Sequence, residues 1–334
     1  MDGIRQEIAA GFEKLLAENC PSERVHAIEA GAEHQSLWAT FEASGFVDAL
    51  VPAAAGGIGL DLDDASPIAE AAGRFAVPVP LAETMVIRGA LALSANNLPP
   101  GSIAFGGNAR LEDGDYICRA VVDGARTDNI LVCLDGQWKW IATRFGSIVE
   151  DGLEATLRFD PEALASQAAL TVVCDPVILE AVTRSLQISG ALAAILDRSL
   201  AYANDREQFG RPIGKFQAIQ HQLSIVAEQA FSGQMAASLA GSGELGSLDP
   251  LRIAIGKART SEAAVEAAAL AHSIHGAIGF TREFDLQLFT RRLNAWRRAG
   301  GSEGYWQRRA GCSLLSENVT ALDVLRRATE KKTD

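Results

Sequence analysis

The chain has 334 residues, of which 48% are hydrophobic and 22% charged, and its formal net charge is −12 at pH 7. This composition is that of an ordinary soluble globular protein, long enough for two or three compact layers or domains. The acidic balance argues against nucleic acid or an anionic membrane as a general partner, because the long-range field of the protein repels a polyanion.

The cysteines are scattered without a Cys-x-x-Cys spacing, which indicates neither a disulfide framework nor a zinc site. Their odd number suits free thiols in a reducing compartment. They are Cys20, Cys118, Cys133, Cys174 and Cys312. Residues 1–16, MDGIRQEIAAGFEKLL, are charged and amphipathic, with neither a signal-peptide core nor an apolar run long enough to cross a bilayer. We therefore expect a cytoplasmic protein without a metal site.

Residues 1–98 are rich in Ala and Glu at helical spacing and predict an N-terminal helical domain. The stretch VPAAAGGIGLDLDD (51–64) interrupts it, because Pro and Gly end one helix and the acidic residues can cap the next.

Residues 99–174 have a different sequence pattern, which predicts a short middle β domain. Apolar segments such as YICRAVV, NILVCL, WKWIA and ATLRFD are separated by Asp-Gly pairs at Asp113, Asp123 and Asp135. An Asp-Gly pair between two such segments is typical of a β-hairpin turn, so we expect a hairpin at each.

Residues 175–334 return to helical periodicity and predict a C-terminal four-helix bundle. The expected helices cover residues 176–205, 216–240, 250–274 and 303–330. The fold class is therefore mainly α, with a small β domain between two helical ones.

Two stretches of the last section resemble signatures of the acyl-CoA dehydrogenase family. They are YANDREQFGRPIGKFQAIQHQLS, around Arg206, and AHSIHGAIGFTREFDLQLFTRR (271–292). VPAAAGGIGLDL and GRFAVPVPLAET, from residues 1–98, are similar to the first domain of the same enzymes, so the resemblance covers nearly the whole chain in order. It implies the acyl-CoA dehydrogenase fold. It also implies a flavoprotein that removes two hydrogens from Cα and Cβ of an acyl-CoA thioester, a carboxylate taking the α-proton and FAD the β-hydride.

The first signature implies an FAD site at the joint of two helices. On this resemblance Arg206, Phe209 and Gln217 would hold the pyrophosphate and adenosine of FAD. An arginine can bind phosphate oxygens with two donors, and the turn from Gly210 to Pro212 lets a ligand approach the backbone. Outside such a motif, an arginine in a helix-joining loop is usually a solvated ion-pair partner.

The second signature contains a match to the family's Gln-x-x-Gly-Gly loop, which lies along the same part of FAD. The corresponding contacts are Ser273, His275, Gly276 and Ala277. The chain departs from the pattern twice, because Ser273 replaces the glutamine and Ala277 the second glycine. His272 and His275 lie in an Ala-rich stretch, where a histidine is more often part of the core than a ligand.

The base of most family members lies in a Tyr-Glu-Gly-Thr stretch shortly before a Gln-Arg pair. Counting back from Gln307 and Arg308 places Gly301 at that position, so no base stands there. Glu303 is close in sequence, but it suits an N-terminal helix carboxylate stabilised by the helix dipole.

A minority of the family takes its base from the first bundle helix, ten residues before a glycine. Gly190 matches that glycine and Glu180 the base. Alternatively, Glu180 is an ordinary exposed carboxylate in the first turn of the helix, or a relic of a former base. We favour this alternative, in which Glu180 is not the base. Glu180 and Arg206 are 26 residues apart on one expected helix, roughly 39 Å at about 1.5 Å per residue. They cannot serve the same flavin, so the FAD held by Arg206 would present its ring to a neighbouring subunit.

The middle section lacks the ring-binding sequences of the family. Complete members carry Thr-Glu-Pro, then Gly-Ser-Asp, then Trp-Ile-Thr, and the corresponding region here reads AFGGNARLEDGDYICRAVVDGARTDN. Residues 140–143, WIAT, are similar to the Trp-Ile-Thr fragment. They follow NILVCLDG instead of preceding it, so we expect Trp140 to be a strand residue that packs in a small sheet. These losses resemble the smaller subunit of a heteromeric bacterial acyl-CoA dehydrogenase, whose larger homologous partner supplies the ring contacts and the base. The resemblance also implies an acyl-CoA substrate and an electron-transfer flavoprotein as acceptor.

Other interpretations remain open. The chain could be a self-sufficient homo-oligomer with Glu180 as base, or an assembly subunit without a ligand. A di-iron site would need paired Glu-x-x-His motifs, and only Glu23 to His26 fits, outside the bundle.

The sequence does not determine what a run of basic residues near the C-terminus binds, or which acyl chain the substrate carries. The run could hold CoA phosphates or a partner's acidic face, although a solvated helical face is the usual case. It consists of Arg291, Arg292, Arg297 and Arg298. No feature of the sequence fixes the acyl chain. The resemblance to paired subunits implies a steroid side-chain thioester first, followed by other ring-bearing or dicarboxylic acyl-CoAs.

Overall fold

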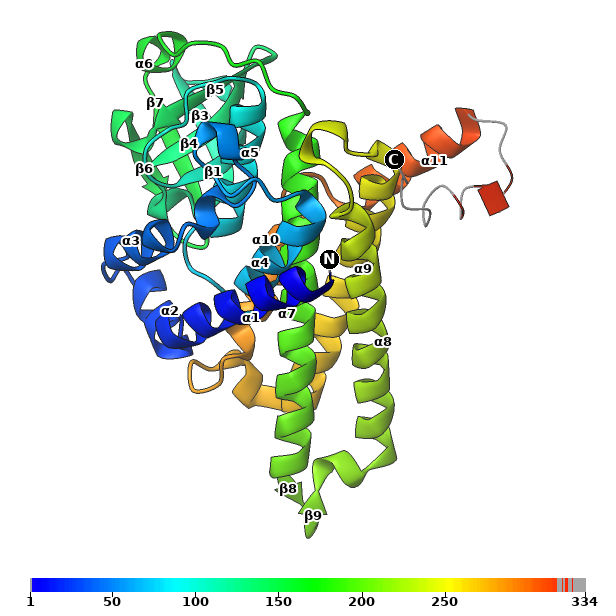
Figure 1. Cartoon of the computed structure of the whole chain (residues 1–334). Coiled ribbons are helices and arrows are strands. Elements are labelled where there is room, and N and C mark those ends of the chain that lie inside the picture. Colours follow the sequence, from blue (N-terminus) through cyan, green and yellow to red (C-terminus); the bar gives the residue numbers. More distant parts are fainter. Residues whose placement is uncertain (1, 317–319, 321, 324–325, 327–334) are drawn as a thin grey trace.

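The structure is a computed structural model that describes residues 2–316, 320, 322–323 and 326. It confirms a mainly helical protein with a small β region between two helical regions (Figure 1). The helices before the strands are α1 (Asp2–Asn19), α2 (Ser22–Glu29), α3 (Gln35–Ser44), α4 (Leu62–Arg74) and α5 (Leu81–Leu93). The break predicted at 51–64 is present, and Asp61 caps α4 by accepting a hydrogen bond from the backbone N–H of Asp64.

The β region consists of two sheets packed around their own small core. One sheet has the order β1-β4-β5, with β1 and β4 parallel, and the other has the order β2-β3-β7-β6. The strands are β1 (Ile103–Asn108), β2 (Arg110–Glu112), β3 (Asp115–Val122), β4 (Asn129–Leu134), β5 (Gln137–Ala142), β6 (Gly146–Glu150) and β7 (Glu154–Phe159), followed by the short helix α6 (Pro161–Ala165). Side chains such as Ile130, Leu157 and Phe159 fill the space between the sheets.

Two of the three predicted hairpins are present, and the third is wrong. Asp113 and Asp135 have positive φ and join antiparallel neighbours, β2 to β3 and β4 to β5. Asp123 also has positive φ, but the chain passes there from one sheet to the other. Its buried carboxylate pairs with Arg126, at 2.9 Å, instead of closing a hairpin.

The four-helix bundle is confirmed, with a different fourth helix from the one expected. The helices of this C-terminal region are α7 (Pro176–Asp205), α8 (Gln217–Ala240), α9 (Pro250–His275), α10 (Leu286–Trp296) and α11 (Glu303–Ser316), of which the first four form the bundle. α10 packs against both α7 and α9, whereas α11 packs mainly on α9. Helix α11 begins at Glu303, as predicted for the helix 303–330. The part of that prediction beyond residue 316 falls largely outside the described residues.

Helix α7 is the central element of the molecule (Figure 1). It packs against α4, α8, α9 and α10. Its length and apolar composition would suffice to cross a membrane, but most of its apolar stretch is buried inside the protein, as in a core helix. Gly190 allows α4 to approach, because a Cβ built there would lie 1.8 Å from the carbonyl oxygen of Glu70. The domain limits at 98/99 and 174/175 stay a prediction, since one hydrophobic core runs through both helical regions.

Candidate active site and cofactor-binding site

The end of α7 forms an exposed hairpin that carries the first signature. The strands β8 (Glu207–Gln208) and β9 (Arg211–Pro212) pair across a turn in which Phe209 and Gly210 have positive φ. Phe209 is 92% exposed. A large apolar ring in water on a strained backbone is an unusual combination, and such combinations cluster at functional sites.

Arg206 is placed at the junction of α7 and this hairpin. Its N–H donates to Tyr202 O (2.9 Å) and its carbonyl accepts from Ile213 N (2.8 Å), so the backbone is held on both sides. The side chain is exposed. Among the described residues, no hydrogen bond or ion pair reaches its guanidinium. A fixed backbone with a free cation suits the binding of an external anion.

The two signatures come together at this end of the bundle. The amide Nε2 of Gln222 on α8 donates to Ser273 Oγ at 3.0 Å, and the hydroxyl of Tyr202 on α7 donates to His275 O at 3.3 Å. Gln217 is the first residue of α8 and is exposed. Gly276 and Ala277 are exposed directly after α9. The structure thus brings the predicted FAD residues together, although their role stays a prediction.

His275 is a core residue rather than a side-chain ligand. It is 3% exposed, and its ring stacks on Tyr202 at 4.5 Å and lies against Phe284 at 4.7 Å. Its Nδ1 faces the carbonyl of Ala271 at 2.7 Å and therefore carries the proton. Burial lowers the pKa of the His275 imidazole, which keeps the ring neutral. Only the backbone of His275 can meet a ligand.

The exposed groups at this end fit the tail of FAD. Arg206 offers charge for a diphosphate, Phe209 an apolar face for adenine, and the N-terminus of α8 has no side-chain cap, which leaves backbone N–H groups for an anion. Gly276, at φ 63 and ψ −145, adopts a conformation open to glycine alone and presents bare backbone.

The second region of interest is a buried charged cluster at the other end of α7. Arg184 contacts Glu83 of α5, and both side chains are fully buried. The same guanidinium lies 3.4 Å from Glu180 Oε1 and 2.9 Å from Gln187 Oε1. Glu180 was expected to be an exposed first-turn carboxylate if it is not the base, and this is wrong, because its side chain is 13% exposed. Burial raises the pKa of the Glu180 carboxyl, against the opposing charges of Arg184 and Lys257.

Gly301, at the usual base position, has no room for a side chain. Its φ is +98, and a Cβ there would lie 2.6 Å from a ring carbon of Tyr305 and 2.8 Å from Nε1 of Trp306. That indole donates to Gly300 O at 2.8 Å and fixes the loop. Glu303 lies on the first turn of α11, as expected, where it pairs with Arg297 at 3.3 Å.

Sequence reasoning missed Glu83, Arg184 and Lys257. Lys257 of α9 is fully buried, and its Nζ donates to the carbonyls of Trp296 (2.9 Å) and Arg297 (3.0 Å). The spacing of four residues between Glu180 and Arg184 on one expected helix was a signal for their pairing. Glu83 and Lys257 lie far away in sequence, where charge within an apolar helical stretch was the available signal. Burial lowers the pKa of Lys257 to about 7.

The basic run is a solvated face only in part: the side chains of Arg291 and Arg298 are 47% and 51% exposed, and each is paired within the chain. Arg291 and Arg292 both pair with Glu29 of α2, and Arg292 is fully buried. Arg298 pairs with Glu154 of β7 at 2.7 Å. These arginines tie α10 and the following loop to the rest of the chain.

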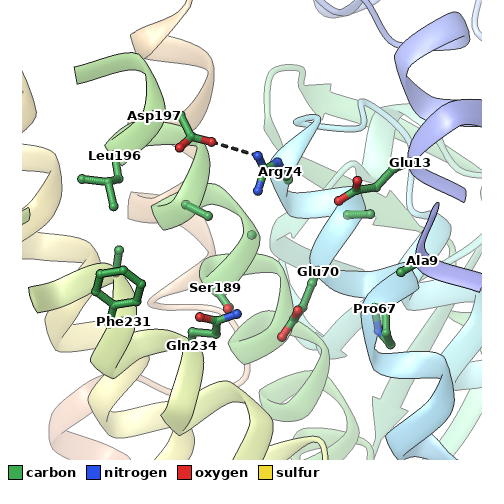
Figure 2. A pocket seen from close by; sticks show the side chains of 14 residues that line it. Ala9, Glu13, Pro67, Glu70, Arg74, Ser189, Leu196, Asp197, Phe231 and Gln234 are labelled. Atoms are coloured by element: carbon green, nitrogen blue, oxygen red, sulfur yellow. Dashed lines mark hydrogen bonds and ion pairs between the residues drawn. The ribbon is translucent and has the colours of Figure 1, made fainter. Parts of the chain in front are cut away.

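Trp140 lies in β5, as expected. The hydroxyl of Thr143, in the same fragment, donates to Thr127 O at 2.8 Å and is used within the chain. A separate hollow of about 380 Å³ lies between α1, α4, α7 and α8. The pair of Arg74 and Asp197 is among the side chains that line it (Figure 2). Neither Glu180 nor any predicted FAD residue lines it.

Comparison with known proteins shows the family to which the chain belongs. Residues 173–311 match the family described as acyl-CoA dehydrogenase, C-terminal domain. The acyl-CoA dehydrogenase IpdE2 of Mycobacterium tuberculosis is 30% identical over 303 residues, covering 87% of this chain and 91% of that protein. The chain therefore belongs to the acyl-CoA dehydrogenase family, whose members are FAD-dependent oxidoreductases.

Solved structures share the fold at low identity. The Tcur3481-Tcur3483 steroid ACAD G363A variant superimposes with a TM-score of 0.77 at 19% identity, covering 93% of this chain and 98% of that one. The ChsE4-ChsE5 complex from Mycobacterium tuberculosis gives 0.71 at 18% identity, covering 95% and 98%.

Proposed function

We propose that this chain is the smaller subunit of a heteromeric, FAD-dependent acyl-CoA dehydrogenase. It holds the pyrophosphate and adenosine of FAD, and a larger homologous subunit supplies the ring contacts and the base. The observation that carries this is the contrast between the two ends of α7. The end near Arg206 is exposed and unpaired, whereas Glu180 is paired in the interior and Gly301 has no side chain.

The length of α7 supports a site shared between subunits. The helix is continuous from Pro176 to Asp205, so Glu180 and Arg206 are separated by roughly 39 Å at about 1.5 Å per residue. When bound, FAD accepts the hydride from Cβ of the acyl chain. The residues of this chain bind and orient its tail: Arg206 neutralises the diphosphate, Phe209 covers the adenine, and Gln217 donates a hydrogen bond.

The relatives support the partner and the substrate class. The structural neighbours include the complex of ChsE4 with ChsE5 and the Tcur3481-Tcur3483 steroid ACAD. We extend this to a ring-bearing acyl-CoA substrate, with a steroid side-chain thioester first, and to an electron-transfer flavoprotein as acceptor. The five cysteines are all free, which suits a reducing cytoplasm.

Co-expression with a larger homologous subunit tests the proposal. We expect the chain alone to be colourless or poorly soluble, and the complex to be yellow and tetrameric. A stable yellow homotetramer with stoichiometric FAD would overturn the heteromer and favour a self-sufficient enzyme. If Arg206→Ala leaves the flavin content of the complex unchanged, this would favour an assembly subunit without a ligand.

A further inference from the structure

Gln222 is placed where the two halves of the proposed FAD-tail site meet. It lies in the second turn of α8, and its Nε2 donates to Ser273 Oγ of α9 at 3.0 Å. Ser273 is the position at which the family's loop carries a glutamine. The chain therefore has a carboxamide beside the position that lacks one, supplied from the facing helix.

The amide of Gln222 is only half satisfied within the chain. Its Oε1 is buried, and no hydrogen-bond partner reaches it among the described residues. Exchanging the amide oxygen and nitrogen would not remove the problem, because the single Ser273 hydroxyl meets only one of them. A buried amide atom without a partner costs stability, whereas an apolar side chain of similar size would not. Folding alone does not account for a glutamine here.

Two other glutamines of α8, Gln220 and Gln229, have partners within the chain. Gln220 donates from Nε2 to Gly214 O at 3.0 Å. Both polar atoms of Gln229 are engaged, the oxygen by Arg259 and the nitrogen by Glu266. Gln222 differs from these two in having its amide oxygen buried without a partner.

We propose that Gln222 is a further FAD-binding residue, which replaces the glutamine missing at Ser273. This rests on the proposed function. The contact between Nε2 and Ser273 Oγ lies at the surface, and the second Nε2 hydrogen is free to donate to a phosphate oxygen or a ribose hydroxyl of the FAD tail. The Ser273 side chain is too short to do this by itself, and it holds the Gln222 amide in place.

The test measures FAD retention in the assembled flavoprotein, whichever subunits it contains, with Gln222→Met in the full chain. Met keeps the length and apolar packing and removes the amide. We expect FAD to be released about 3- to 10-fold faster after dilution, the effect of one neutral hydrogen bond. The thermal midpoint of the FAD-free protein should be unchanged or higher. Gln234→Met, on the same helix at the hollow of Figure 2, is the matched control and should change neither quantity.

A relocation variant tests the replacement directly. Gln222→Ala should release FAD faster, and adding Ser273→Gln should restore retention to within about threefold of the unchanged protein, because the carboxamide returns to the loop. If Gln222→Ala releases FAD faster and adding Ser273→Gln does not restore retention, Gln222 has only a structural role and the inference is overturned.

Arg206→Ala in the same assay separates the two proposals. If Arg206→Ala releases FAD and Gln222→Met does not, only the assignment of Gln222 fails. If neither variant affects FAD, the tail site itself is wrong. A fall in the thermal midpoint of the FAD-free Gln222→Met protein would also contradict the binding role, because the amide would then serve folding.

Discussion

Gly300 packs directly against Glu180. A Cβ built at Gly300 would lie 3.1 Å from Cγ of Glu180 and 2.9 Å from the backbone nitrogen of Ala181. The loop with the family's usual base position therefore touches the helix with its alternative base position. Both positions belong to one place in the fold, where Gly300 packs on Glu180 and the neighbouring Arg184 contacts Glu83.

A base cannot simply be restored at the usual position. Gly301→Glu would place an L-residue at φ +98 and drive its Cβ into Tyr305 and Trp306. We expect the free energy of unfolding to fall by about 2–5 kcal/mol, from the left-handed backbone and the overpacking. Chemical denaturation measures it. Gly304→Glu is the control, since a Cβ there meets nothing within 4 Å; equal stability of the two variants would contradict the packing argument.

The flavin content should depend on Arg206 more than on Gln217. Loss of a charge-assisted contact to phosphate costs on the order of 2–3 kcal/mol, so Arg206→Ala should weaken FAD binding roughly 30- to 150-fold. Gln217→Ala removes a neutral hydrogen bond, about 1 kcal/mol, and should weaken it roughly fivefold. Flavin absorbance after serial dilution measures retention. Lys215→Ala, an exposed cation in the same joint, should behave as the unchanged chain.

Periodicity and turn chemistry were sufficient for much of the fold. The limits of α7, α8 and α9 follow from apolar spacing bounded by Pro and Gly, and the turns at Asp113 and Asp135 from Asp-Gly pairs. The hairpin predicted at Asp123 is wrong because Asp123 is used there for a buried ion pair with Arg126. α10 was missed as a bundle helix because it is short and carries arginines whose partner, Glu29, is more than 200 residues away.

The candidate site was predictable only where it is local. A continuous motif placed Arg206, Phe209 and Gln217, and helix length placed them far from Glu180. Arg184 is four residues after Glu180 on the same helix, so that pair could have been predicted from spacing. The contact of Arg184 with Glu83 could not, because the two meet only through the packing of α5 on α7. Gln222 lies within the first signature, but its importance depends on Ser273, which lies on another helix.

Lys257 should make stability depend on pH. Burial, opposed by the charge of Glu180, lowers its pKa from the usual 10.5 to about 7. Between these values the unfolded chain holds a proton that the folded chain has released. The free energy of unfolding should therefore rise with pH from about 7 to 10.5, by at most about 1.4 kcal/mol per unit.

The comparison for Lys257 is Lys257→Met, which removes the titrating group and the hydrogen bonds to Trp296 and Arg297. Urea unfolding at several pH values should show the rise in the unchanged chain and a flatter profile in the variant. Parallel profiles would mean that Lys257 keeps its proton in the folded state throughout this range.

Glu180 should be dispensable for turnover. A general base must lie within hydrogen-bond reach of the substrate α-proton, and it contributes about 10²- to 10⁴-fold. Glu180 is instead held against Arg184, with Gly300 packed on its side chain. Glu180→Gln keeps the size and an oxygen that accepts from Arg184 and removes the basicity. We expect acyl-CoA oxidation by the complex, followed with an artificial electron acceptor, to stay within a few-fold of the unchanged enzyme.

The stability of Glu180→Gln provides an independent readout of the same contact. Burial raises the pKa of Glu180 above its usual value of 4.5, so the folded state binds more protons than the unfolded state between the two values. Ionisation of Glu180 therefore lowers the free energy of unfolding as pH rises through that window, and Gln removes this loss. Stability near neutral pH should be equal or higher in the variant. A 10²-fold or greater fall in turnover with FAD content and stability intact would instead make Glu180 the base and give this subunit an active site of its own.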